Sequence, residues 1–211
     1  MKISKPSPDS AYNNQCLEDM KDLLRQPTVK EMRPCPNCSI PCKCSKSPTC
    51  TCSCSKGCAF TPVQMSSDGE RYPIEENIVP LVYEFNCLRV CPPCWSCEGH
   101  VDNSGTLNKI PRVWFYSRSL FYPRMISEYL TNLQFAKKLK YPWHIVVTYT
   151  PDDCLETTFS IEPRIESIEN ASLIDLQHDA LTISDNLLES LQYSAREYIA
   201  QYSENAQQFK V

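Results

Sequence analysis

Glycine is scarce in this chain, with four glycines among 211 residues, and its scarcity excludes a group of folds. Neither G-x-G-x-x-G nor G-x-x-x-x-G-K-[ST] occurs, so we expect no Gly-rich phosphate-binding loop. No run approaches the roughly 18 apolar residues that a membrane-spanning helix needs, so no membrane partner is expected. The N-terminal residues MKISKPSPDSAYNN lack an apolar segment. We therefore expect no secretory signal and a location in the nucleus or the cytoplasm.

Cysteine and proline are abundant by contrast, with fourteen and seventeen residues. Thiols stay reduced in the nucleus and the cytosol, where structural disulfides are rare. Cysteine clusters in such proteins more often bind metal than form disulfides. We therefore interpret the cysteines as ligands for a thiophilic metal, with zinc as the expected ion, and keep disulfides as the weaker interpretation.

The first cysteine group places eight thiols within the twenty-four residues 35–58. Ile40 is the only aliphatic side chain there, so the segment cannot bury a core and any order must come from metal or cross-links. A closed zinc site needs four tetrahedral ligands, and sulfurs in C-x-C pairs are too close to serve well-separated ions. Some sulfurs are therefore expected to bridge two ions. The members of the group are Cys35, Cys38, Cys42, Cys44, Cys50, Cys52, Cys54 and Cys58.

The second cysteine group follows after a polar spacer and has the spacing Cys87-x3-Cys91-x2-Cys94-x2-Cys97-x2-His100. Two interpretations remain open for it. The four cysteines could form their own zinc knuckle, with His100 as an alternate ligand. They could instead complete the cluster that the first group begins.

The second interpretation is supported by a resemblance to a known family. The run Cys42-x-Cys44-x5-Cys50, then Cys52 and Cys54, and finally Val82-Tyr83-Glu84-Phe85-Asn86-Cys87-x3-Cys91 resembles the pre-SET region of histone lysine methyltransferases. In that family, nine cysteines from two segments hold three zinc ions through bridging thiolates. The resemblance implies nine ligands here, with Cys58 as a substitute for Cys54, and with Cys35 and Cys38 as extra thiols. These nine are Cys42, Cys44, Cys50, Cys52, Cys54, Cys87, Cys91, Cys94 and Cys97.

The resemblance covers about a quarter of the chain and stops at residue 100. Phe85 stands where the family usually has a cysteine, and the last two cysteine intervals differ in length. No G-W-G or N-H-S-C sequence of a SET domain follows. The resemblance therefore implies a zinc scaffold in a chromatin-associated protein and does not imply methyl transfer.

Iron–sulfur chemistry is the main alternative to zinc. Cys91-x2-Cys94-x2-Cys97 matches the start of a ferredoxin run, whose fourth ligand would stand at position 101 before a proline. The sequence has Val101-Asp102 there instead. A cysteine-rich stretch without a dedicated metal is also left open, as are ligand roles for Cys16 and Cys154.

The rest of the chain predicts an α+β fold, in which an irregular cysteine-rich zinc cluster precedes a small mixed domain with a C-terminal helical segment. We expect a polar arm with a short helix over 1–34, the cluster over 35–100 with a spacer at 59–77, and the domain over 101–211. The spacing of apolar residues and the turn signals predict the individual elements. We expect extended segments at Ile78–Phe85, Val113–Tyr116, Trp143–Tyr149 and Thr157–Ile161, and helices at Cys16–Arg25, Ser119–Leu139 and Ser172–Asn205, the last broken near Thr182–Asp185.

Charge is unevenly placed in a chain whose net charge is -4. Residues 109–144 carry seven basic groups against one acid, whereas the acids outnumber the bases from residue 150 onward. Arg112, Arg118 and Arg124 are interleaved with aromatic residues, a pattern that could bind an anionic partner such as a nucleic acid. The basic and acidic regions could equally attract each other within one domain.

These observations together predict a non-catalytic zinc protein that binds another protein, within a chromatin complex. The sequence contains no nucleophile elbow and no H-E-x-x-H motif, so it does not favour an enzyme. An iron–sulfur protein in electron transfer, or one that assists a modifying enzyme, is the first alternative. A zinc-dependent nucleic-acid-binding protein is the second.

Overall fold

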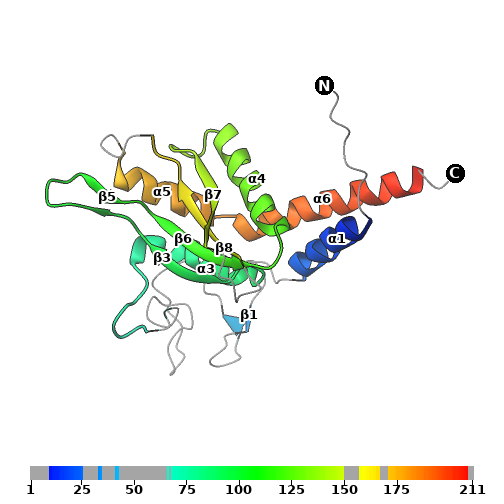
Figure 1. Cartoon of the computed structure of the whole chain (residues 1–211), viewed down its shortest axis with the longest axis horizontal. Helices are drawn as coiled ribbons and strands as arrows, with labels where there is room; N and C mark the ends of the chain where they lie inside the picture. Colours follow the sequence, from blue (N-terminus) through cyan, green and yellow to red (C-terminus); the bar gives the residue numbers. More distant parts are fainter. Residues whose placement is uncertain are drawn as a thin grey trace.

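The computed structural model describes residues 10–25, 33–34, 41–42, 66, 68–149, 157–166 and 171–208. Within these ranges it confirms the α+β class, with helices packed on an antiparallel sheet (Figure 1). The strands are β1 Arg33–Pro34, β2 Pro41–Cys42, β3 Pro93–Cys97, β4 His100–Val101, β5 Leu107–Lys109, β6 Arg112–Ser117, β7 Trp143–Tyr149 and β8 Thr157–Pro163. The helices are α1 Ser10–Leu24, η1 Glu76–Ile78, α3 Val79–Leu88, α4 Phe121–Phe135, α5 Leu173–Ser184 and α6 Leu187–Gln208.

The central sheet has four antiparallel strands in the order β3-β6-β8-β7. Successive side chains of β6 point to opposite faces, so Val113 and Phe115 are buried while Trp114 between them lies on the other face. Phe115 pairs with Phe159 of β8, and their rings stack with centroids 5.7 Å apart. Between β3 and β6 the chain continues into the β4–β5 hairpin, which projects from one end of the molecule (Figure 1).

Helix α3 packs against β3 and β6 and forms the centre of the core. The sequence predicted an extended segment at Ile78–Phe85, and this prediction is wrong. Nine of the ten helical residues are buried, including Glu84, so the segment has no polar face. A short apolar run buried on all sides cannot be assigned to helix or strand by periodicity, and its valines favoured the strand. Pro80 fits because it lies in the first turn, where no backbone N–H is required.

Helix α1 confirms the predicted helix at Cys16–Arg25 and extends it back to Ser10. It lies alongside α6 at one end of the molecule (Figure 1). Leu23 is fully buried, and its carbonyl oxygen accepts a hydrogen bond from Gln192 Nε2 at 3.1 Å. The Tyr122 hydroxyl donates to the carbonyl oxygen of Asp19 at 3.2 Å. Residues expected to form a polar arm therefore contribute one helix to the common core.

The other predicted elements are confirmed with small shifts at their ends. Strand β6 covers the segment predicted at Val113–Tyr116, and α4 covers most of the predicted helix at Ser119–Leu139. Strands β7 and β8 pair as expected. The C-terminal helical segment is broken at residues 185 and 186, next to the predicted position. None of the helices in the described part of the chain is both long and apolar enough to cross a membrane.

The boundary expected at residue 100 runs through this one folded unit. Strand β3, from the second cysteine group, pairs with β6 in the same sheet, and Cys97 stands opposite Arg112. Cys87 and Cys91 belong to the main hydrophobic core. Residues 68–100 are therefore part of the α+β domain, whereas most of 35–58 lies outside the described residues.

Asp179 of α5 is a fully buried carboxylate that holds the segment before β7. It accepts hydrogen bonds from the backbone N–H groups of Lys140 and Tyr141, each at 2.9 Å, and from Trp143 Nε1 at 3.4 Å. A buried carboxylate is tolerated only when donors of this kind replace its hydration. This residue therefore fixes α5 against the start of β7.

We expect Asp179→Ala to lower the free energy of unfolding by about 2–5 kcal/mol, because it leaves two partly buried backbone N–H groups and the buried Trp143 indole N–H without their acceptor. Asp175 on the same helix is the matched control, since it makes a partly exposed ion pair with Lys140 at 3.1 Å. Asp175→Ala should cost less than about 1 kcal/mol. Urea denaturation of the three proteins checks this, and equal effects of the two substitutions would contradict the assigned role.

Candidate metal centre

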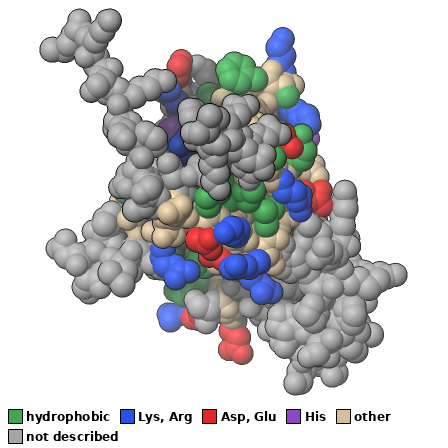
Figure 2. Space-filling view, turned by 90° about the vertical axis from the view of Figure 1, so that its right-hand side faces the viewer, with side chains coloured by type: hydrophobic (Ala, Val, Ile, Leu, Met, Phe, Trp, Pro, Cys, Tyr) green, Lys and Arg blue, Asp and Glu red, His purple; other side chains and the backbone are tan. Residues whose placement is uncertain are grey.

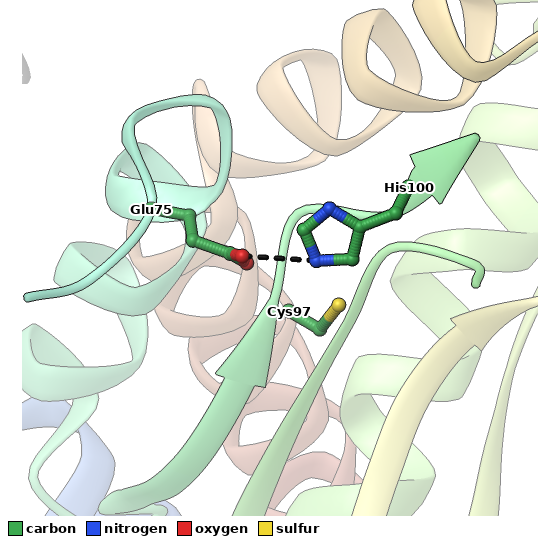
Figure 3. A group of neighbouring side chains, drawn as sticks. All are labelled: Glu75, Cys97 and His100. Carbon is green, nitrogen blue, oxygen red and sulfur yellow. Dashed lines mark ion pairs between the residues drawn. The ribbon is translucent and has the colours of Figure 1, made fainter. Parts of the chain in front are cut away.

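Glu75, Cys97 and His100 bring a carboxylate oxygen, a thiol sulfur and an imidazole nitrogen within 4.8 Å of one another (Figure 3). Glu75 directly precedes η1, Cys97 is the last residue of β3, and His100 is the first residue of β4. The carboxylate points toward the imidazole, and Glu75 Oε1 lies 3.0 Å from His100 Nε2. This is the one group of three or more potential ligands among the described residues.

Backbone hydrogen bonds hold the two segments of this site against each other. Glu75 Oε2 accepts from the N–H of Glu98 at 2.7 Å, and Glu98 Oε2 accepts from the N–H of Asn77 at 2.9 Å. Gln177 of α5 also donates to the carbonyl oxygen of Glu98 at 3.1 Å. Partners that orient ligands in this way lower the reorganisation that metal binding requires. The segments that carry the three candidate ligands are therefore held together by contacts within the protein itself.

Gly99 lies in the short link between β3 and β4, between Cys97 and His100. Its φ of +86° lies in the left-handed region that favours glycine. A Cβ atom here would lie 2.9 Å from Pro111 Cδ and 3.0 Å from the carbonyl oxygen of Lys109. The link between β3 and β4 therefore depends on glycine for both its backbone conformation and its space.

The three candidate ligands differ in how far they are exposed to solvent. Cys97 is 4% exposed, while the side chains of Glu75 and His100 are 35% and 41% exposed. Burial raises the pKa of the Cys97 thiol above its usual value, and the N–H of Gly99, 3.4 Å from the sulfur, partly offsets this. The thiol is therefore protonated at neutral pH, and a metal that bound there would displace its proton.

The donor set is compatible with zinc. Zinc binds cysteine, histidine and carboxylate ligands in a tetrahedron. Its bond lengths place neighbouring ligand atoms roughly 3.3–3.6 Å apart. The three donors need only small side-chain movements to reach these separations, because they already lie within 4.8 Å of one another.

The structure does not bring the four cysteines of the second group together at one point. Cys91 is buried beside Ser117 at the end of β6, whereas Cys97 lies opposite Arg112 at its start. Five residues of extended strand separate these positions by roughly 16 Å. Cys94 interacts with Tyr116, and Cys87 lies in the core as part of α3. The arrangement therefore assigns Cys97 and the alternate ligand His100 to one site, without the other three thiols.

The first cysteine group lies outside the described residues, apart from the backbone of Cys42 in β2. The three-zinc cluster stays a prediction for this reason, and so does a ligand role for Cys154. Cys16 is half-buried on α1 and belongs to no ligand group among the residues that the structure describes.

The three arginines expected to bind an anion have different neighbours. Arg112 lies over the ring of Trp95, 6.0 Å from its centroid, and 3.8 Å from the Glu162 carboxylate. Arg118 lies near Tyr122, and Arg124 lies near Tyr198. In each case the positive charge of the arginine lowers the pKa of the tyrosine and partly offsets other effects that raise it. Figure 2 shows basic and acidic side chains intermingled on the face at the α1 and α6 end. The described side chains of that face therefore form no surface of one charge.

Comparison with known proteins gives no relative: no family model, curated protein or solved structure matches this chain. The function has to be argued from the site itself.

Sequence reasoning missed Glu75 as a ligand. The spacing Cys97-x2-His100 marked two members of the site, but Glu75 lies in the polar spacer with no motif around it. Only the packing of α3 against β3 brings this acid to the end of the strand.

We expect Gly99→Ala to destabilise the fold and to weaken zinc binding, because the added methyl group displaces the link that joins Cys97 to His100. Gly105 is the matched control, since its φ is +83° with no atom within 4 Å of the added Cβ. Gly105→Ala should cost only the backbone strain of about 1–2 kcal/mol. Thermal unfolding and zinc titration of both variants test this, and unchanged zinc affinity in Gly99→Ala would contradict it.

Proposed function

We propose that this chain is a non-catalytic zinc-binding protein that serves as an interaction subunit for another protein. The observation behind the proposal is the convergence of Glu75, Cys97 and His100, three zinc-type donors from two separate segments. Clusters of this composition in a groove are candidates for metal binding on chemical grounds alone.

Zinc at this position would join the segment before α3 to the link between β3 and β4. Those segments are 22 residues apart in the chain, and their contacts with each other include backbone-to-carboxylate hydrogen bonds. A metal that binds only the folded state stabilises it in proportion to the logarithm of its concentration over its dissociation constant. The expected role is to fix the shape of the surface around the site.

A chromatin-associated, nuclear role is the more specific part of the proposal. Its support is the pre-SET-like spacing of Cys42 to Cys54 in the sequence, since the cysteines of the second group do not converge on one point. In this version the first cysteine group binds further zinc ions and provides a rigid platform. An enzymatic role has less support, since no nucleophile–base pair of a known catalytic motif occurs in the sequence.

The iron–sulfur alternative requires four thiolates around one cluster. Within the second group, Cys97 alone belongs to the candidate site. The other two donors of that site are the His100 nitrogen and a Glu75 oxygen. This donor set favours zinc over an iron–sulfur cluster at the described site.

Zinc content of the purified full chain tests the metal proposal. We expect Cys97→Ser and His100→Ala each to lose about one zinc ion per chain, because three protein ligands bind one ion. Cys16→Ser is the matched control, because Cys16 is half-buried and outside the site, and it should keep the full zinc content. Anaerobic elemental analysis measures this; equal zinc in all four proteins, or iron with labile sulfide in place of zinc, would overturn the proposal.

Nucleic-acid binding is a second candidate function, favoured by one aromatic pair. Trp95 is 46% exposed, its ring centroid lies 4.9 Å from that of Trp114, and the Arg112 guanidinium lies over its ring. Exposed aromatic rings beside arginine can stack on unpaired bases.

We expect Trp95→Ala to weaken binding of a single-stranded RNA oligonucleotide by about 1–3 kcal/mol if this surface is used. Tyr193, which is 64% exposed on α6, is the matched control for loss of an aromatic ring. Fluorescence anisotropy at low and high salt measures the affinity, which should fall with salt. No binding at low salt, or equal losses in Trp95→Ala and Tyr193→Ala, would remove this candidate.

A further inference from the structure

The Glu75–Cys97–His100 site supplies three ligands to an ion that takes four. Zinc in closed structural sites has four protein ligands, whereas sites that exchange ligands have three and receive the fourth from outside. No other cysteine, histidine or acidic residue joins the three within the described part of the chain. Cys94 lies in the same groove but belongs to no such group.

The exposed side of the site faces a groove of about 710 Å³. The buried ligand, Cys97, closes the inner side, while Glu75 and His100 remain more than a third exposed. Figure 3 shows the three donors converging from two neighbouring segments. A fourth ligand of the ion therefore has access from the groove.

The charges of the groove favour an anionic ligand. One zinc ion, one thiolate, one carboxylate and one neutral imidazole have a net charge of zero, so a further anion would leave one negative charge. Lys109 of β5 stands opposite His100 of β4 in the strand pairing. Among the described residues, Lys109 and Arg71 are the two cationic residues that line the groove. Glu75 is the single acid among the lining residues, and the metal would neutralise it.

The groove also has an apolar side. Tyr72 is 64% exposed and Trp95 is 46% exposed, and Pro73, Ile74 and Val82 lie beside them in the lining. A small free carboxylate would leave this surface uncovered. An acidic residue with apolar neighbours on a peptide chain would contact both the cations and the apolar side.

We infer that the zinc ion binds the carboxylate of an acidic peptide segment from a partner protein as its fourth ligand. One carboxylate oxygen binds the metal, Lys109 neutralises the charge, and the apolar flanks of the peptide cover Trp95 and Tyr72. This inference rests on the proposed zinc site and names the chemistry of the partner that it recognises.

Cadmium NMR of the full chain tests the inference, because the resonance of a bound cadmium ion reports its donor atoms. A site with one sulfur, one nitrogen and one carboxylate is resolved from sites made only of thiolates. His100→Ala should remove this resonance and so assign it. Absence of any mixed-donor resonance would overturn the proposed site itself.

The ligand is tested by titration of the cadmium-loaded chain with acetyl-Leu-Glu-Leu-amide. We expect the mixed-donor resonance to move and saturate, with acetyl-Leu-Gln-Leu-amide causing no change. Acetate is the second arm and should bind more weakly than the peptide. Affinity for acetate equal to that for the peptide would overturn the peptide assignment. A resonance typical of two sulfur donors that does not move with either the peptide or acetate would show that a thiol of the chain is the fourth ligand. That result would also overturn the peptide assignment.

Lys109→Gln should weaken binding of the acidic peptide about two- to fivefold, the range of a single exposed ion pair. Lys138 is the matched control, because it is exposed and lines a different cavity between α4 and α6. Lys138→Gln should leave the peptide affinity unchanged. An equal loss of peptide affinity in both variants would show that Lys109 acts only through the net charge of the chain, and would overturn its assigned role.

Discussion

The burial of α3 is the constraint on which the rest of the structure depends. This helix packs on β3 and β6 with almost no exposed side chain, and Phe85 contacts Phe115 with ring centroids 4.7 Å apart. Because α3 cannot turn or slide without exposing apolar surface, the segment just before it has one position. Glu75 stands in that segment. Core packing thus places a ligand at the end of β3.

The site joins this rigid element to the link between β3 and β4. Strand pairing fixes Cys97 opposite Arg112 and His100 opposite Lys109, and Gly99, with its φ of +86°, sets the path of the chain between them. The carboxylates of Glu75 and Glu98 each accept a backbone N–H from the opposite segment. A change that loosens this link would therefore affect both the stability of the fold and the geometry of the candidate site.

Much of the fold could be predicted from local patterns. The β-branched and aromatic run at Trp143–Tyr149 and the helical spacing after Ser119 both appear as expected. The failure at Ile78–Phe85 has a physical cause, because a helix buried on every side has no polar face to reveal its period. The packing of α1 on the core was missed for a related reason. Its sequence is mostly polar, so the single buried leucine, Leu23, did not indicate which face of the helix would be buried.

For the candidate site, the sequence by itself determined the chemistry: abundant thiols, no glycine-rich loop, and the local pair Cys97-x2-His100. Tertiary structure decided which residues meet. It separated Cys91 from Cys97 along β6, because an extended strand lengthens the chain, and it added Glu75 from the polar spacer. Spacing along a chain gives distances only within one element. The contact between two elements depends on how their buried faces pack.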